Sequence, residues 1–379
     1  MTEPTPPSPP PRLPISVLTG YLGSGKTTLL SRLIREPGMA RTAVVINEFG
    51  EVGLDHLLVS KVDENTVLMD SGCICCTIRT DLADTLRDLF LRRVRGEVTE
   101  FDRVVIETTG LADPAPILHT LMTDPLVASR FRLDGVVTTV DAVFGQQQLT
   151  RNEESLKQAA VADRLVLTKT DIAEPAQVEA LTARLRQLNP AASIVTAQSP
   201  EALSSLLFDA GLYNPASKSL DVQRWLKAEA YGDGHHHGHD HDHGHDHAHC
   251  DHDHGHCDHD HHDHDHHGHG HAHRHDDGIG AFCLTIDEPV SWDKLVHFLE
   301  TLARLRGPDI LRVKGLLNVA EADRPIVIHG VQHLFHPPVQ LEEWPSDDRR
   351  TRIVFITRDV SRPVVEALYK ACVGEGEAA

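Results

Sequence analysis

Short apolar runs and amphipathic stretches alternate along residues 15–196. The apolar runs are rich in β-branched residues and predict strands at 15–19, 42–47, 67–69, 103–107, 135–140, 164–168 and 193–196. Between them, residues 27–35 and 80–92 carry leucines three and four positions apart, the spacing of an amphipathic helix. This alternation predicts an α/β domain with a mostly parallel sheet and helices on both of its faces.

A second patterned region begins at residue 278. It predicts a strand at 281–286, a helix at 292–305, strands at 311–319, 325–329 and 352–357, and a helix at 363–372. The order β-α-β-β-β-α is similar to the ferredoxin-like split arrangement. We therefore expect a small α+β, ferredoxin-like C-terminal domain.

The segment between these two regions has an unusual composition. Residues 233–277 hold 22 of the 28 histidines and 12 aspartates, with no apolar side chain larger than alanine apart from two cysteines. Such a segment cannot bury a core, so we expect a disordered linker. The predicted organisation is a disordered proline-rich arm at 1–12, a nucleotide-binding domain at 13–215, a connector at 216–232, the linker at 233–277 and the C-terminal domain at 278–375.

Charge and composition exclude several classes of protein. The formal net charge is −20, and the linker supplies −11 of it through 12 Asp and one Arg, which argues against a nucleic-acid partner. No apolar run is long enough for a membrane helix, and the first 12 residues lack the apolar core of a secretory signal. Seven cysteines, three of them within four positions, do not form a disulfide framework. We expect a cytoplasmic protein with no membrane partner.

A phosphate-loop motif follows the first predicted strand directly. Residues 20–27 read Gly-Tyr-Leu-Gly-Ser-Gly-Lys-Thr and fit G-x-x-x-x-G-K-[ST] between a strand and a helix. Backbone N–H groups of such a loop surround the phosphates, and the helix N-terminus adds partial positive charge. The lysine is expected to bridge the β- and γ-phosphates, and the threonine to bind Mg²⁺. The expected nucleotide ligands here are Gly20, Gly23, Ser24, Gly25, Lys26, Thr27 and Thr28.

The strand at 103–107 ends in an acid where a magnesium site needs one. Residues 104–110 read Val-Val-Ile-Glu-Thr-Thr-Gly, which places Glu107 at the carboxyl end of the sheet. Gly110 is expected to bring a backbone N–H to the γ-phosphate. We assign catalytic roles to Lys26, Thr27 and Glu107, although Glu107 also fits an ordinary carboxylate at a strand end. No general base stands out.

Another strand ends in a turn suited to recognition of the base. Thr168, Lys169, Thr170 and Asp171 follow one another at the end of the strand at 164–168. An aspartate there accepts from both guanine N1–H and the guanine amino group, a donor pair that adenine lacks. Lys169 and Asp171 therefore favour GTP over ATP, although Thr168 stands where the usual guanine signature has Asn.

Three cysteines in four residues suggest a metal site. Cys73, Cys75 and Cys76 follow a glycine between two strands of the nucleotide-binding domain. Zinc prefers four tetrahedral ligands, and thiolates are among the commonest. Glu51, or a ligand from a partner, is expected to complete the set. Such an incompletely closed site suits metal transfer, and the alternatives are small buried side chains or redox thiols.

The linker offers many weaker ligands. Imidazole and carboxylate suit Zn²⁺, Ni²⁺, Co²⁺ or Cu²⁺, so the linker is expected to raise the local metal concentration; a polar solubilising linker is the alternative. Representative weak ligands are His235, His236, His237, Cys250 and Cys257. Elsewhere, His56 and His119 are expected to be surface or packing residues, and His329, His333 and His336 are candidates for a minor site.

Location suggests how nucleotide and metal communicate. Residues 47–55 follow the second predicted strand, where nucleotide-sensing loops of P-loop proteins move. If the γ-phosphate orders this segment, it also sets the distance between Glu51 and the thiols. Hydrolysis is then expected to change the affinity for metal, as an order–disorder switch does.

Taken together, these motifs resemble those of the CobW-type metallochaperone GTPases. The resemblance covers about residues 13–375 and rests on five motifs, at 20–27, 47–51, 72–76, 107–110 and 168–171. It implies that the cysteine motif binds zinc or a related metal, that GTP hydrolysis accompanies delivery to a client apoprotein, and that the small domain contacts the client. Ile46 departs from the pattern, since some relatives carry an acidic metal ligand there.

The function expected from this resemblance is a GTP-hydrolysing zinc metallochaperone that uses GTP, Mg²⁺ and Zn²⁺ or Co²⁺ or Ni²⁺. Its expected partner is an unidentified client metalloprotein, and the chain is compatible with a homodimer. A cobalt chaperone for cobalamin synthesis, a metal buffer regulated by nucleotide and a small-molecule kinase are the alternatives. A kinase would leave the thiol cluster without a purpose.

Overall fold

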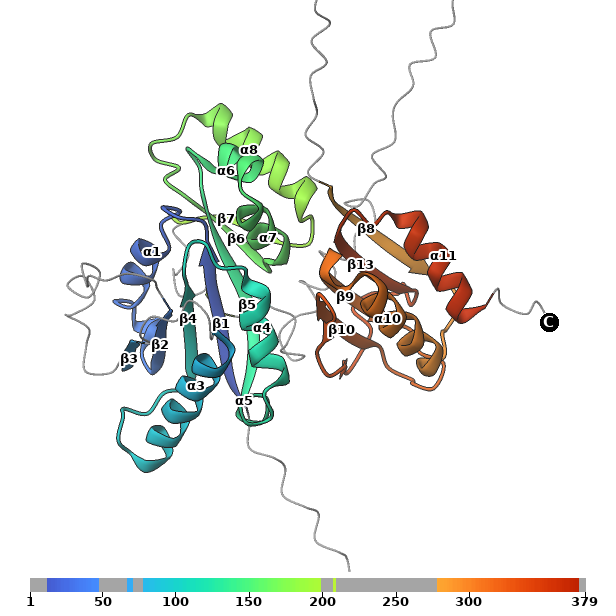
Figure 1. The fold of residues 1–379 in the computed structure, drawn as a ribbon, viewed down its shortest axis with the longest axis horizontal. Helices are drawn as coiled ribbons and strands as arrows, with labels where there is room; N and C mark the ends of the chain where they lie inside the picture. The colour runs from blue at the N-terminus through green and yellow to red at the C-terminus, as the bar shows by residue number, and fades with distance from the viewer. Residues whose placement is uncertain (1–11, 48–66, 71–77, 199–206, 209–277, 375–379) are drawn as a thin grey trace, which may run out of the picture. The chain divides into compact units, whose positions relative to one another are not determined.

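The computed structural model describes residues 12–47, 67–70, 78–198, 207–208 and 278–374 (Figure 1). The chain forms two compact units, one made of Met1–Gly232 with Asp277–Ala379 and the other of Asp233–Asp276. The second unit corresponds to the expected linker and lies outside the described residues.

Seven strands of the first unit form one sheet. They are β1 (Leu13–Gly20), β2 (Thr42–Asn47), β3 (Val67–Asp70), β4 (Arg103–Thr108), β5 (Phe131–Asp141), β6 (Arg164–Thr168) and β7 (Ser193–Thr196). Their order is β3-β2-β4-β1-β5-β6-β7, and every neighbouring pair is parallel. The predicted strands and the predicted α/β class are confirmed. β5 begins at 131 rather than 135 because Phe131 and Leu133 are buried in the core.

Helices cover both faces of this sheet (Figure 1). α1 (Lys26–Leu33) packs its leucines against the face that carries Leu18, whereas α3 (Ile78–Arg95) and α4 (Pro114–Thr123) pack against the face that carries Ile15 and Val17. Successive side chains of a strand alternate between faces, so β1 contributes to both cores. α6 (Gly145–Arg151), α7 (Glu153–Val161) and α8 (Pro175–Leu188) pack beside β5 and β6.

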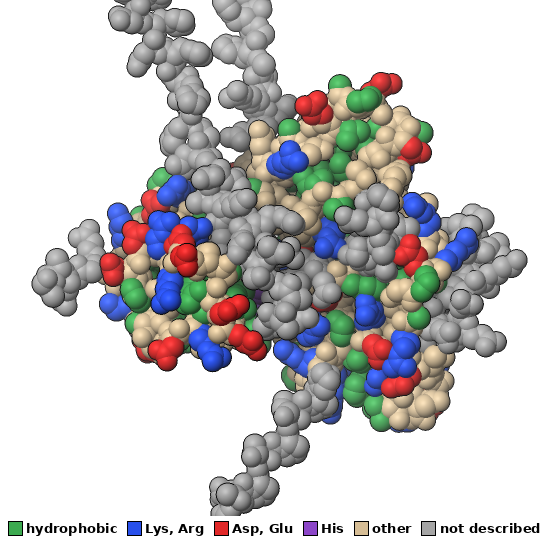
Figure 2. Space-filling view, turned by 180° about the vertical axis from the view of Figure 1, so that it is seen from behind, with side chains coloured by type: hydrophobic (Ala, Val, Ile, Leu, Met, Phe, Trp, Pro, Cys, Tyr) green, Lys and Arg blue, Asp and Glu red, His purple; other side chains and the backbone are tan. Residues whose placement is uncertain are grey.

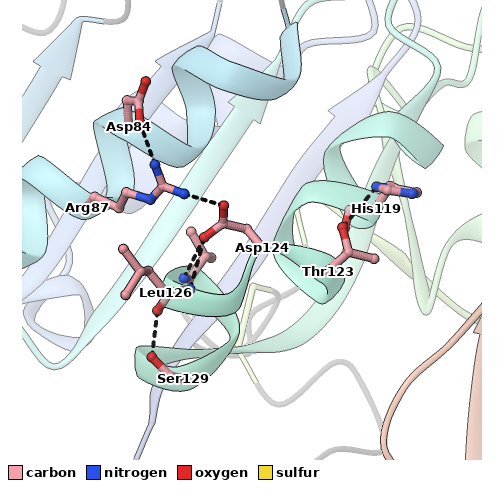
Figure 3. A network of polar contacts seen from close by, with 8 residues as sticks. Asp84, Arg87, His119, Thr123, Asp124, Leu126 and Ser129 are labelled. Carbon is pink, nitrogen blue, oxygen red and sulfur yellow. Dashed lines mark hydrogen bonds and ion pairs between the residues drawn. The ribbon is translucent and has the colours of Figure 1, made fainter.

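A polar network fixes the position of α3 (Figure 3). Arg87 donates to Asp84 at 2.8 Å and to Asp124 at 2.5 Å. The other oxygen of Asp124 accepts from the backbone N–H groups of Leu126 and Val127, which caps α5 (Pro125–Arg130). One carboxylate thus ties α3, the helix that follows the cysteine motif along the chain, to the start of α5.

The C-terminal region forms an antiparallel sheet. β8 (Ile279–Ile286), β9 (Ile310–Leu317), β10 (Ile326–Val331), β11 (Leu334–Phe335) and β13 (Thr351–Arg358) lie in the order β11-β10-β9-β13-β8, and β12 (Val339–Gln340) pairs with β10. β13 is antiparallel to both β8 and β9, which α10 (Trp292–Arg306) connects. This is the expected split arrangement, and the α+β class is confirmed. α10 and α11 (Arg362–Val373) supply the helical side of the core.

A buried ion cluster links β9 to the start of β6. Asp163 Oδ1 accepts from Arg312 Nη2 and from Lys314 Nζ, each at 2.7 Å, and Asp163 Oδ2 accepts from the N–H of Val136. All three charged side chains are buried. Burial alone would raise the pKa of Asp163, but the two cations outweigh it and hold this pKa below its usual value.

The surface carries charges of both signs. Figure 2 shows Lys and Arg side chains intermixed with Asp and Glu on the face drawn, and some of them form exposed ion pairs such as Arg41 with Asp102. Exposed pairs of this kind contribute little to folding. In the part of the chain that the structure describes, no helix has the length and apolarity to cross a bilayer.

Candidate nucleotide-binding site

The loop between β1 and α1 has the backbone of a phosphate-binding loop. Gly20 has a φ of 145°, and a Cβ there would lie 2.7 Å from Ser24 Oγ, so only glycine fits. Gly25 has a φ of 86° and forms the N-cap of α1. Lys26 is buried and its Nζ donates to the carbonyl of Gly20 at 3.0 Å. The loop therefore curls around the lysine with its amides gathered at the start of the helix.

Neighbouring strands hold this loop in place through hydroxyl groups. Ser24 Oγ and Thr139 Oγ1 lie 2.7 Å apart, and Thr168 Oγ1 donates to the Ser24 carbonyl at 2.7 Å. β5, the neighbour of β1 in the sheet, carries Thr139, and β6, the next strand along, carries Thr168. Thr168, the departure from the usual guanine signature, thus fixes the phosphate loop directly.

The expected magnesium ligands lie together. Thr27 Oγ1 donates to Glu107 Oε1 at 2.8 Å, across from the first turn of α1 to the end of β4. Glu107 is only 1% exposed. A hydroxyl and a carboxylate oxygen are ligands that Mg²⁺ prefers, so the residues present fit this ion. Thr28 is exposed on the same turn of α1.

Gly110 lies against the phosphate loop. A Cβ at this position would lie 2.8 Å from both the N and the Cα of Leu22. On its other side, Gln158 Nε2 of α7 donates to the carbonyls of Gly110 and Ala112, at 3.2 and 2.9 Å. Gly110 is therefore held between the loop and α7.

The predicted base-recognition residues follow β6 directly. Lys169 has a φ of 57°, and its Nζ forms a 2.6 Å ion pair with Asp141 Oδ2 at the end of β5. Asp171 Oδ1 accepts from Gln198 Nε2 at 2.9 Å, while Thr170 Oγ1 donates to Gln198 Oε1 at 2.8 Å. The turn thus presents a lysine and an oriented carboxylate beside the phosphate loop.

The backbone register relates the cysteine motif to this site. Ile46 of β2 pairs with Asp70 of β3 on one side and with Glu107 of β4 on the other. Neighbouring strands lie about 4.8 Å apart, so the backbones of Asp70 and Glu107 lie about 10 Å apart across the sheet. The chain enters the cysteine motif directly after Asp70, at the edge of the sheet that carries the phosphate loop.

The predicted metal ligands for zinc and the linker metals lie outside the described residues. They are Glu51, Cys73, Cys75 and Cys76, and, in the linker, His235, His236, His237, Cys250 and Cys257. His56 is outside them as well. Their ligand roles remain predictions.

The prediction of a minor metal site at His329, His333 and His336 is wrong. No group of three His, Cys, Asp or Glu side chains in the described ranges is arranged to hold a metal ion. Burial and the nearby Arg312 lower the pKa of His336 to about 3, and burial with Arg312 and Lys314 lowers the pKa of His329 well below its usual value. His333 instead packs against His119, with ring centroids 5.6 Å apart, so His119 is a packing residue as expected.

Two family models match this chain, one over each of its two sheets. The CobW/HypB/UreG nucleotide-binding domain matches residues 14–196, and the cobalamin synthesis protein cobW C-terminal domain matches residues 279–373. The chain belongs to the CobW family. The resemblance expected from the five motifs is confirmed.

Individual relatives of this CobW-family protein carry names that refer to zinc. It is 28% identical to the zinc chaperone YjiA of Escherichia coli, over 94% of this chain and 97% of the relative. It is 32% identical to the zinc-regulated GTPase metalloprotein activator 1 of Schizosaccharomyces pombe, over 48% of this chain and 45% of that one. The crystal structure of Zn(II)-bound YjiA GTPase covers 96% of this chain with a TM-score of 0.64 at 24% identity, which shows that the two share a fold.

Several residues of the site escaped the sequence analysis. Asp141 ends a strand in an acid, as Glu107 does, and that signal was available. Gln158 and Gln198 belong to a helix and a loop with no motif around them. Only the fold brings their amides to Gly110 and Asp171.

Proposed function

We propose that this chain is a GTP-hydrolysing zinc metallochaperone that binds zinc with Cys73, Cys75, Cys76 and Glu51 and transfers it to a client apoprotein. The observation that carries the proposal is the Thr27–Glu107 contact of 2.8 Å at a phosphate loop, with a single strand, β2, between the strand of Glu107 and the strand that leads into three cysteines. The printed names of the relatives, zinc chaperone and zinc-regulated GTPase metalloprotein activator, support the same reading.

The described residues have the chemistry for phosphoryl transfer. The amides of residues 20–27 and Lys26 bind the phosphates, and Thr27 and Glu107 would hold Mg²⁺. When bound, Mg²⁺ supplies positive charge to the β- and γ-phosphate oxygens. Gly110, pressed against Leu22, brings its backbone to the end of the loop where a third phosphate extends. Binding and positioning are thus supplied by one edge of the sheet.

The preference for GTP rests on two side chains. Asp171 is oriented by Gln198 to accept from the guanine N1–H and amino group, and Lys169 is held by Asp141 to cover the base. Adenine has no matching donor pair, so the carboxylate would face it unpaired. The base-binding role stands as part of the proposal.

Coupling to metal follows from the short path along the sheet edge. Glu107, Ile46 and Asp70 lie in one row, and residues 47–55 and 71–77 continue from β2 and β3 at that edge. A γ-phosphate that orders residues 47–55 would change the distance from Glu51 to the cysteines. Hydrolysis would then release zinc to the client, and the linker histidines would supply zinc to the site.

Three variants of the full chain test this proposal through bound zinc and GTPase rate. Cys75→Ser is expected to lose one tightly bound equivalent of zinc, because a thiolate ligand is removed. Deletion of residues 233–277 is expected to lose several weak equivalents and to keep the tight one. Lys26→Ala is expected to keep the tight zinc and to lose GTP hydrolysis.

Other results of these measurements would contradict the proposal or favour one of its alternatives. Loss of the tight equivalent on deletion of the linker would contradict the cysteine assignment. Hydrolysis stimulated by Co²⁺ and not by Zn²⁺ would favour a cobalt chaperone. Full protection of cells against zinc stress by Lys26→Ala would favour a metal buffer.

A further inference from the structure

Gln158 is a buried amide with an unusual set of contacts. Its side chain on α7 is fully buried, and its Nε2 donates to the carbonyls of Gly110 and Ala112. Among the described residues, no donor reaches its Oε1. A buried acceptor without a donor is costly, and an apolar side chain of the same size would avoid that cost. The two donations are therefore what this side chain provides.

α7 is well placed to act as a rigid support for residues 110–113. The carbonyl of Gln158 itself accepts from Thr138 Oγ1 of β5 at 2.8 Å, which fixes the helix to the sheet. The preceding residue, Lys157, forms a 3.3 Å ion pair with Asp113, which caps α4. One helix thus fixes both ends of the segment that presses Gly110 against Leu22.

We propose that Gln158 is a positioning residue that holds the Gly110–Ala112 turn against the phosphate loop and thereby sets the preference for nucleoside triphosphate over diphosphate. The inference rests on the proposed function, because it takes the loop to bind GTP. In the proposed binding mode, the β-phosphate would contact the loop of residues 20–27 in both nucleotides, whereas only a γ-phosphate would extend as far as Gly110, which lies against Leu22 of that loop. A loosened turn should therefore weaken triphosphate binding selectively.

The test compares affinities for GDP and for the non-hydrolysable analogue GMPPNP, with Mg²⁺, by calorimetry on the full chain. Gln158→Met keeps the volume and removes both donations. We expect the dissociation constant for GMPPNP to rise about tenfold and that for GDP to change less than about twofold, since one or two hydrogen bonds are lost.

Asn189, the C-cap of α8, provides a matched control because its side chain also holds α7. Its buried Nδ2 donates to the carbonyls of Ala159, Ala160 and Ala162 at the C-terminal end of α7, so removing it loosens that helix end and leaves the two Gln158 donations in place. Asn189→Leu should lower the melting temperature and leave the ratio of the two nucleotide affinities unchanged. A selective loss of GMPPNP binding in this control would show that general loosening of α7 is responsible, and would overturn the proposal.

The remaining outcomes also support or contradict the positioning role of Gln158. Equal weakening of GDP and GMPPNP by Gln158→Met would overturn the positioning role. If that variant does not fold, Lys157→Met breaks the partly exposed pair with Asp113, and it should weaken GMPPNP about threefold more than GDP; equal effects would again contradict the proposal. Failure of the unmodified chain to bind either nucleotide would contradict the proposed function instead.

Discussion

Glu107 illustrates how a single side chain acquires its role from its position. It ends a buried strand, it is 1% exposed, and its Oε1 accepts from Thr27. A buried carboxylate is expensive unless a cation or hydrogen bonds compensate it. The divalent cation proposed to bind here with Thr27 would add to the compensation that the Thr27 hydroxyl provides.

Glu107→Gln keeps the shape and removes the charge. We expect Mg²⁺-dependent GTP hydrolysis to fall about 100-fold, because the metal contributes several kcal/mol of charge stabilisation. Affinity for GDP measured without Mg²⁺ should stay within about twofold, since the phosphate loop is untouched. The exposed Glu100→Gln serves as the control for loss of one carboxylate. A Glu107→Gln rate equal to that of the unmodified chain would contradict the magnesium role.

At the scale of elements, the phosphate loop, Glu107 and Thr168 were predictable because each follows an apolar strand. Parallel strands place their carboxyl ends at one edge, so residues 80 or more positions apart in the sequence, such as Thr27 and Glu107, meet there. In the sequence, Thr168 stands out only as a replacement for the Asn of the usual guanine signature, whereas in the fold it donates to the Ser24 carbonyl and holds the phosphate loop. Hydroxyl contacts of this kind depend on the register of β6, which periodicity does not reveal.

The ion cluster at Asp163 was not predictable for a related reason. Asp163 directly precedes β6, and Arg312 and Lys314 alternate on β9, about 150 residues later in a strand that reads as an ordinary amphipathic run. Three charges in a strand–loop pattern suggest solvent exposure. Their burial follows from the tertiary packing of the two sheets.

Asp163→Asn tests the energetic role of this cluster. It leaves Arg312 and Lys314 buried without the carboxylate charge of Asp163. We therefore expect the free energy of unfolding, measured with denaturant, to fall by about 3–5 kcal/mol. Asp102→Asn removes a carboxylate that pairs with Arg41 at the exposed surface, and its midpoint should be nearly unchanged. Equal effects of the two substitutions would contradict the buried-cluster account.

For the whole molecule, the decisive question is whether nucleotide and metal sites exchange free energy. The sheet supplies the path, since Asp70 and Glu107 pair with the same residue of β2. The phosphate-loop motif and the cysteine spacing predict the two sites separately. Strand order depends on the fold, so the sequence does not reveal that a single strand, β2, separates β3, which leads into the cysteine motif, from β4, which carries Glu107.

The most direct measurement of this coupling is the zinc dissociation constant of the full chain in three states: without nucleotide, with GDP, and with GMPPNP and Mg²⁺. A zinc-chelating dye that competes with the protein for zinc brings the dissociation constant of the tight site into the measurable range. We predict at least about a tenfold difference between the GDP and GMPPNP states, which is the size of a typical coupling free energy. Cys75→Ser should abolish that difference. Identical zinc affinities in all three states would contradict nucleotide-controlled delivery.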